Sequence, residues 1–93
     1  MRKNVGSVME YIDLYAKRIL QLCAQRGISI NYFSKMSGVK QSTLDNIVRG
    51  VTKNPTAKTL HKIAVAFSMT FSEFTNFQEL NDYSFEDTDD DTD

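Results

Sequence analysis

The stretch GISINYFSKMSGVKQSTLDNIVRG, residues 27–50, decides the fold of this chain. It contains a helix-length segment from Ile30 to Met36, with Phe33 and Met36 on one apolar face. Gly38 follows, and glycine readily takes the positive φ angle that a tight turn between helices needs. Four apolar residues then recur at helical spacing: Val39, Leu44, Ile47 and Val48. The pattern predicts two short helices joined by a sharp turn.

The other face of the second predicted helix is polar. Its side chains are mostly hydrogen-bond donors and acceptors of a size that suits the edges of DNA bases. They are Lys40, Gln41, Ser42, Asp45, Asn46 and Arg49. Two short helices around a turn, the second with a polar outer face, have the layout of a helix-turn-helix, which places one helix in the DNA major groove.

Four blocks of sequence, in order between Ile19 and Phe74, resemble the lambda-repressor/Cro-like (XRE-type) helix-turn-helix family. They are I-x-x-L-x-x-x-x-G-I-S from Ile19, S-G-V-x-x-S-T-L from Ser37, I-V-R-G from Ile47 and N-P-T-x-x-T-L-x-K-I-A from Asn54. The resemblance implies an all-α fold, a compact five-helix lambda-repressor-like domain, and binding to double-stranded DNA.

By match to the family's motif, Lys40, Gln41, Ser42 and Asn46 are expected to face the groove. Base contacts are expected from Gln41, Ser42 and Asn46, and their chemistry adds Asp45, which can accept from cytosine, and Thr43, which offers a methyl or hydroxyl. Gln41 is the leading candidate, because a carboxamide can form two hydrogen bonds with adenine. Contacts to phosphates are expected beside this helix, where they position a protein without reading sequence. The phosphate candidates are Lys40, Asn31, Arg49, Lys53, Asn54 and Lys58. The alternative for each residue is a solvated polar surface.

The chain departs from the family's pattern at three positions. Ile30 stands where the family often has a phosphate-binding Gln, and Asn31 is the nearest substitute. Cys23 and Val48 stand where the family often has an Arg–Glu ion pair. A joint change of such a pair to apolar groups can be neutral or stabilising. We therefore predict that Cys23 and Val48 touch in the core.

Helix signals divide the chain into a helical domain, residues 1–80 with the helix-turn-helix at 29–49, and an acidic tail, residues 81–93. Ser7 to Glu10 has capping-box spacing and predicts a first helix from Val8 to about Gln25. Ser29, Thr56 and Thr70 are expected caps of later helices. The predicted helices span about 30–36, 41–49, 57–67 and 71 to 77 or 80.

Charge is distributed unevenly. Residues 1–80 hold 11 Lys and Arg and 5 acids, a net charge of +6, whereas residues 81–93 hold 7 acids and no base. A basic body fits nucleic-acid binding. The tail has too few apolar residues to offset its ordering entropy, so we expect disorder. Three readings stay open for it: a solubilising extension, a segment that folds back on the basic face, or a partner-binding segment.

Composition argues against several other classes of protein. A single Cys excludes an internal disulfide, and one Cys with one His makes no convincing metal set. No nucleophile is paired with a base and no glycine-rich phosphate loop occurs, so we expect neither an enzyme nor a cofactor. No apolar run approaches the roughly 18 residues of a membrane span. We expect a cytoplasmic protein without membrane contact.

The C-terminal part of the domain is rich in aromatic residues, and we expect a homodimer surface there, at Phe74, Phe77 and Leu80. The alternative is that Phe71 and Phe74 complete the core while Tyr83 and Phe85 are loosely ordered. The leading hypothesis is a sequence-specific transcriptional regulator, a repressor. The other is a protein-interaction module, antitoxin-like or an adaptor, which uses this fold as a scaffold and binds a partner through its C-terminal segment.

Overall fold

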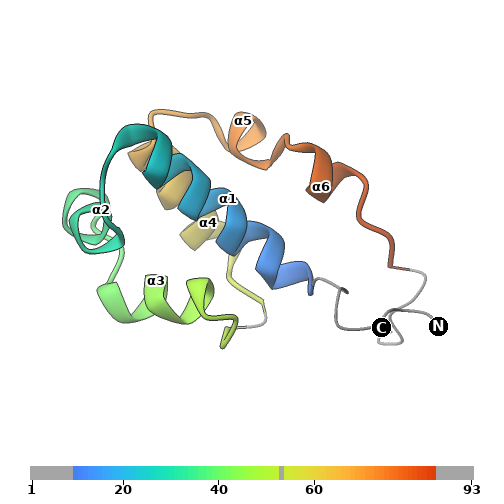
Figure 1. Cartoon of the computed structure of the whole chain (residues 1–93), viewed down its shortest axis with the longest axis horizontal. Helices are drawn as coiled ribbons and strands as arrows, with labels where there is room; N and C mark the ends of the chain where they lie inside the picture. The colour runs from blue at the N-terminus through green and yellow to red at the C-terminus, as the bar shows by residue number, and fades with distance from the viewer. Residues whose placement is uncertain (1–9, 53, 86–93) are drawn as a thin grey trace.

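The computed structural model describes residues 10–52 and 54–85. In these ranges the chain forms six α-helices and no strand, as Figure 1 shows. The helices are α1 (Tyr11–Arg26), α2 (Ile30–Ser37), α3 (Gln41–Val48), α4 (Ala57–Ala66), α5 (Phe71–Thr75) and α6 (Gln78–Asn81). The expectation of an all-α fold is confirmed.

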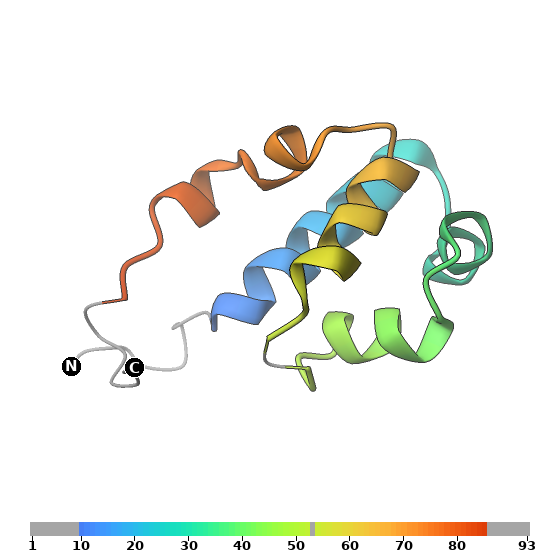
Figure 2. The same ribbon diagram turned by 180° about the vertical axis from the view of Figure 1, so that it is seen from behind.

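Helices α1 and α4 overlap at the centre of both views, and both contribute buried side chains to one core. Figures 1 and 2 show α2 and α3 against one side of this pair, and α5 and α6 on the other. Among the described residues, α1 contacts α2, α3 and α6, and α4 contacts α2 and α5. This arrangement holds α3 at the edge of the molecule, where its outer face is open to solvent.

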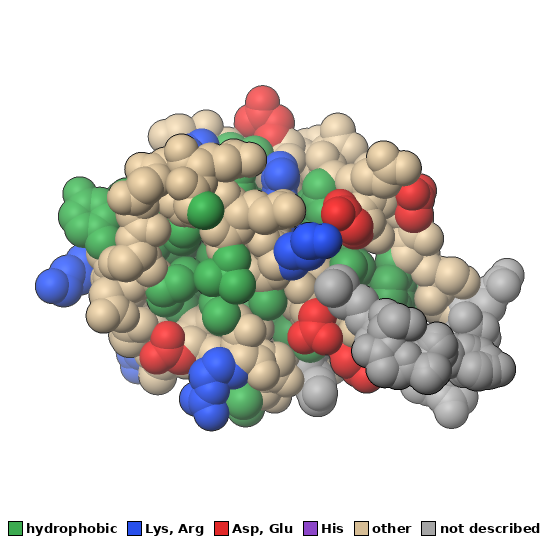
Figure 3. Space-filling view, viewed as in Figure 1, with side chains coloured by type: hydrophobic (Ala, Val, Ile, Leu, Met, Phe, Trp, Pro, Cys, Tyr) green, Lys and Arg blue, Asp and Glu red, His purple; other side chains and the backbone are tan. Residues whose placement is uncertain are grey.

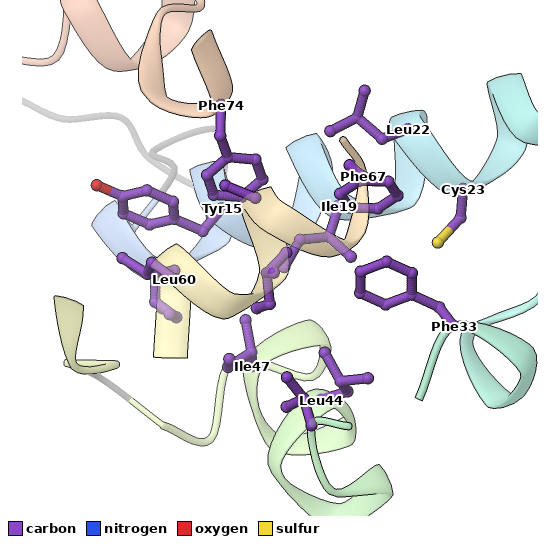
Figure 4. Close-up of a cluster of buried hydrophobic side chains, with 14 residues drawn as sticks. Tyr15, Ile19, Leu22, Cys23, Phe33, Leu44, Ile47, Leu60, Phe67 and Phe74 are labelled. Atoms are coloured by element: carbon purple, nitrogen blue, oxygen red, sulfur yellow. The ribbon is translucent and has the colours of Figure 1, made fainter. Parts of the chain in front are cut away.

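The core is built around two stacked phenylalanine rings. Phe33 of α2 and Phe67, just after α4, lie 4.2 Å apart between ring centroids, with 17° between their planes. Side chains of Ile19, Leu44 and Ile47 point toward them, as the close-up in Figure 4 shows. All five side chains are fully buried, and burying each one contributes about 1.5–3 kcal/mol. This core fixes α3 against α1 and α2.

Local capping signals start three of the helices where the sequence predicts. The Ser29 hydroxyl accepts a hydrogen bond from the Tyr32 amide at 3.0 Å. Thr56 accepts one from the Thr59 amide at 3.1 Å. At Thr70 a complete capping box forms, with Glu73 bonded back to the Thr70 amide at 2.9 Å.

The predicted start of the first helix is wrong. The backbone of Glu10 is extended, with φ −69° and ψ 154°, so α1 begins at Tyr11 rather than Val8. The Asp13 carboxylate accepts a hydrogen bond from the Glu10 amide at 3.2 Å and so fixes this start. Ser7, the expected capping residue, lies outside the described residues.

The predicted fifth helix is two helices, which makes six in place of five. Asn76 and Phe77 have non-helical backbones, with ψ 76° and 152°, and separate α5 from α6. The Thr75 hydroxyl bonds the carbonyls of Phe71 and Ser72, at 3.0 and 3.3 Å. Such side-chain bonding to the preceding turn occupies carbonyls at the end of α5 and competes with regular helix.

Helix α4 ends in a Schellman motif without a glycine. The amide of Met69 donates to the carbonyl of Ala64 at 2.9 Å, and that of Ser68 to Val65 at 2.8 Å. Ser68 takes the left-handed conformation, φ 61°, and is the only described non-glycine residue with positive φ. Sequence signals do not show this strained position.

Candidate nucleic-acid interface

Hydrogen bonds from two serines hold the turn between α2 and α3. The Ser34 hydroxyl donates to the carbonyl of Val39 at 2.8 Å. The Ser37 hydroxyl accepts from the amide of Val39 at 3.0 Å. Gly38 has φ 78°, as the turn requires, and the side chain of Val39 is buried. The turn therefore sets the angle at which α3 leaves α2.

Met36 does not share the core position of Phe33. Its side chain is 45% exposed, so the prediction of a common buried face on α2 is wrong for Met36. It lines an open surface groove with α4 residues that include Lys58, Lys62 and Val65. Phe33 is the one fully buried side chain of α2, and Ile30 also packs against the core.

On α3 the buried and polar faces are clearly separated. Leu44 and Ile47 are completely buried, whereas Ser42 is exposed and Asn46 is half-buried one turn further on. Residues four apart share a helix face. Ser42 and Asn46 therefore form one row on the outer face of α3.

Gln41 and Asp45 form a second row beside the first. The amide nitrogen of Gln41 donates a hydrogen bond to Asp45 Oδ1 at 3.0 Å, and both residues are half-buried. Thr43 is half-buried and begins the row that continues with buried Ile47. Thr43 therefore lies on a flank of the helix next to the core, as Gln41 does three residues before buried Leu44.

A backbone turn follows α3 and leads toward α4. The carbonyl of Asn46 accepts hydrogen bonds from the amides of Val51 and Thr52, at 2.8 and 3.2 Å. Gly50 takes φ 76°, and a Cβ added there would lie 3.2 Å from Asp13 Oδ1. The turn therefore lies against the start of α1.

Five of the six predicted phosphate-contact residues are exposed: Asn31, Lys40, Arg49, Asn54 and Lys58. Lys40 is the residue that precedes α3, and Arg49 follows its last residue. Asn54 and Lys58 lie in the loop before α4 and in its first turn. Lys53 lies outside the described residues. In Figure 3 most of the charged side chains over the end of the molecule formed by α2 and α3 are basic.

The predicted dimer surface needs a correction at Phe74. This side chain is fully buried and stacks on Tyr15, with 6.5 Å between the ring centroids, so it belongs to the core. Phe77 and Leu80 are half-buried and keep some surface. Tyr83 and Phe85 lie in the predicted tail but pack their rings on Tyr11, at 5.2 and 5.4 Å.

Two arginines of α1 have structural roles that sequence reasoning missed. Arg18 donates to the carbonyls of Phe74 and Glu73, each at 3.0 Å, and so binds α5 to α1. Arg26 donates to the carbonyl of Phe67 at 2.7 Å, beyond the end of α4. The only local signal is that both are cations on the longest helix, which does not identify partners so distant in sequence.

Cys23 is buried, and its burial raises the pKa of the thiol, although nearby Arg26 acts in the opposite direction. Val48 is half-buried, and its predicted contact with Cys23 stays a prediction. Among the described residues no group of three or more His, Cys, Asp or Glu is placed to hold a metal ion. None of the described helices is long and apolar enough to cross a membrane.

Comparison with known families agrees with this geometry. A family model described as helix-turn-helix, HTH_3, matches residues 19–74, which contain α2, α3, α4 and the turns between them. The protein belongs to the HTH_3 helix-turn-helix family. The resemblance to lambda-repressor/Cro-like proteins is confirmed, and the chain contains a DNA-binding domain of this type.

Two solved structures resemble this HTH_3 domain. One is an HTH_3 family transcriptional regulator from Vibrio cholerae, 32% identical, with a TM-score of 0.64 over 77% of this chain and 38% of that chain. This chain thus spans less than half of the length of that regulator. The other is prophage Lp1 protein 11, with a TM-score of 0.71 over 81% of this chain and 100% of that chain. At 24% identity it shows the fold alone. A comparison with curated proteins gave no match.

Proposed function

We propose that this HTH_3 protein is a sequence-specific transcriptional regulator, a repressor that reads the DNA major groove with α3. One observation carries the proposal. Leu44 and Ile47 anchor α3 in the core, while Gln41, Ser42 and Asn46 are at least partly open to solvent on its other faces. A helix held rigidly with a polar face outward is what direct base reading requires.

The two rows on α3 have different roles in this proposal. Ser42 and Asn46 donate to or accept from base edges along the exposed row. Gln41 reads adenine, and Asp45 orients its carboxamide through the 3.0 Å hydrogen bond. Asp45 also discourages wrong bases or accepts from cytosine. Thr43, toward the core side, contributes at most a methyl or hydroxyl contact.

Phosphate contacts flank the reading helix. Lys40 and Asn31 lie before α3, and Arg49, Lys53, Asn54 and Lys58 follow it. Each neutralised phosphate contributes about −0.9 to the slope of log affinity against log salt. Binding is therefore expected to weaken steeply as salt rises, even where the DNA sequence is not the preferred one.

The regulator acts as a homodimer in this proposal. One domain covers only a few base pairs, so two half-sites about one helical turn apart are needed for selectivity. Phe77 and Leu80 provide the dimer surface, extended by Phe85, which is 62% exposed. Repression is steric: the dimer occupies a site that overlaps a promoter. The protein works in the cytoplasm and needs no cofactor, metal or membrane.

Selection of bound duplexes from a random pool tests this function. The parent chain is expected to enrich an inverted repeat. Gln41→Ala is expected to relax selection at one position of each half-site, by about 1–3 kcal/mol of discrimination. Gln21→Ala changes an exposed glutamine of α1 and should leave selection as it is. Failure to enrich any sequence at low salt would refute the regulator and favour the protein-interaction module.

A further inference from the structure

Aromatic contacts fix the place from which the acidic residues 86–93 continue. The ring of Phe85 lies 5.4 Å from that of Tyr11 and 4.9 Å from that of Tyr83. Tyr83 in turn lies 5.2 Å from Tyr11. Because Tyr11 is the first residue of α1, residue 85 is held at the start of that helix.

The start of α1 lies beside the turn that follows the reading helix. Asp13, two residues after Tyr11, is so close to Gly50 that an added Cβ would lie 3.2 Å from its carboxylate. Gly50 directly follows Arg49. In Figures 1 and 2 the described chain ends on the side of the molecule where α1 starts, whereas the turn after α3 lies nearer the middle, below α1. The acidic segment thus continues from the end of α1 that also contacts this turn.

Charges favour the loop between α3 and α4 as the place where the segment binds. Residues 86–93, EDTDDDTD, carry six acids and no base. Three acids near the point where this segment begins repel it: Glu10, Asp13 and Asp82. Arg49 and Lys58, on either side of the loop between α3 and α4, are exposed and attract it. Figure 3 shows acidic side chains gathered mainly over the half with α5, α6 and the start of α1.

We propose that residues 86–93 bind across the loop between α3 and α4 and occupy Arg49 and Lys58, in competition with DNA phosphates. Eight extended residues reach about 26 Å from Phe85, whose ring contacts Tyr11 at the start of α1. A short tether gives an effective concentration of roughly millimolar order. The segment weakens the binding of every duplex that needs Arg49 and Lys58 by the same factor. Non-specific DNA, with a Kd of about 10⁻⁴–10⁻⁶ M, then binds very weakly, whereas a specific site of about 10⁻⁸ M or tighter keeps enough affinity to displace the segment.

The contact itself is tested without DNA. A charge-neutral chain of equal length carries E86Q, D87N, D89N, D90N, D91N and D93N. Amide NMR spectra of this chain and the parent are expected to differ around residues 49–58 at low salt and to coincide there at 1 M salt. Differences confined to the residues next to Phe85 would overturn the proposal. This measurement does not depend on the proposed function.

The regulatory effect, which does rest on the proposed function, is tested by affinity for a fixed duplex of arbitrary sequence. The charge-neutral chain is expected to bind about tenfold more tightly than the parent at low salt, with the gap closing as salt rises. Glu79→Gln, which removes one acid of the folded domain outside the segment, is the control for a change in charge alone. Equal affinities of parent and charge-neutral chains would overturn the competition. Failure of every variant to bind any duplex would overturn the proposed function, while the NMR comparison would still decide the contact.

Discussion

The side-chain amide of Gln41 donates a 3.0 Å hydrogen bond to Asp45, one turn further along α3. A carboxamide has two N–H donors and one carbonyl acceptor, so a donor and the acceptor remain for a base. Asp45 therefore restricts the orientation of the side chain proposed to read adenine. A side chain whose rotamer is fixed before binding loses less entropy when it meets its base.

We expect Asp45→Ala to reduce discrimination at the base pair that Gln41 reads, because the carboxamide loses its orientation. The same change should tighten binding to arbitrary duplex, because a carboxylate near the phosphates is removed. Titrations of a selected duplex and an arbitrary one separate the two effects. Gln41→Ala should then reduce discrimination by less in the Asp45→Ala background than it does in the parent chain. Full additivity would show that the two residues act independently.

Arg18 is expected to stabilise the C-terminal part of the fold. Arg18→Met keeps an apolar stem but leaves the carbonyls of Phe74 and Glu73 without their charged donor, and removes the guanidinium 5.1 Å from the Phe77 ring centroid. Lost hydrogen bonds to a charged group predict destabilisation by about 1.5–3 kcal/mol, measured by urea unfolding. Lys17→Met is the control. It removes only an exposed 3.5 Å ion pair with Glu79 and should change stability little.

Ser68→Gly should stabilise the protein. Ser68 occupies the left-handed region at φ 61°, which costs a non-glycine residue about 1–2 kcal/mol. Glycine removes most of this strain, but its own unfolded-state entropy offsets part of the gain, so we expect the free energy of unfolding to rise by up to about 1 kcal/mol.

Gly27→Ala is the control, because it makes the opposite change and adds a side chain at a residue with positive φ. Nothing lies within 4 Å of a Cβ added there, so its expected loss of about 1–2 kcal/mol reports the backbone at φ 66° alone. A loss of stability in Ser68→Gly would show that the Ser68 side chain outweighs its strain.

Stability is expected to fall at alkaline pH. Burial raises the pKa of the Cys23 thiol, and burial together with a 2.9 Å hydrogen bond to Tyr11 raises that of the Tyr15 hydroxyl. Both groups hold their protons more tightly in the folded state than in the unfolded state. Their contribution to the free energy of unfolding is therefore complete below the ordinary thiol pKa of about 8.5. It is lost as pH rises through the folded-state pKa values of the two groups. Urea unfolding between pH 7 and 10.5 should show the decline, and Cys23→Ala should make it shallower. If the stability of Cys23→Ala declined equally steeply with pH, the decline would be due to Tyr15 or other groups and not to Cys23.

The starts of α2, α4 and α5 and the helix-turn-helix itself could be predicted because their signals are local. Ser29, Thr56 and Thr70 each bond to an amide three residues away, so the sequence alone specifies the partner. Gly38 marks its turn in the same way. The paired rows on α3 also follow from helical spacing, although the bond between Gln41 and Asp45 does not follow uniquely from it.

Positions that depend on distant partners could not be predicted. The sequence leaves Phe74 open to either a dimer surface or the core, and the structure packs it on Tyr15 in the core. Met36 has the spacing of a core residue, but α4 does not cover it. The partners of Arg18 lie 55 and 56 residues away, beyond any local pattern. In each case packing between elements, rather than the preference of one segment, decides burial.

The ring contacts between Tyr11 and Phe85 have a consequence for the order of folding. They join the first turn of the described fold to its last residue, so nearly the whole chain forms the loop that they close. Closing a long loop costs more entropy than closing the short loop between α2 and α3, and contacts between residues far apart in sequence slow folding. We therefore expect the C-terminal segment to dock last and to open first in hydrogen exchange. An opening of this kind would leave the helix-turn-helix assembled while releasing the acidic residues from their anchor.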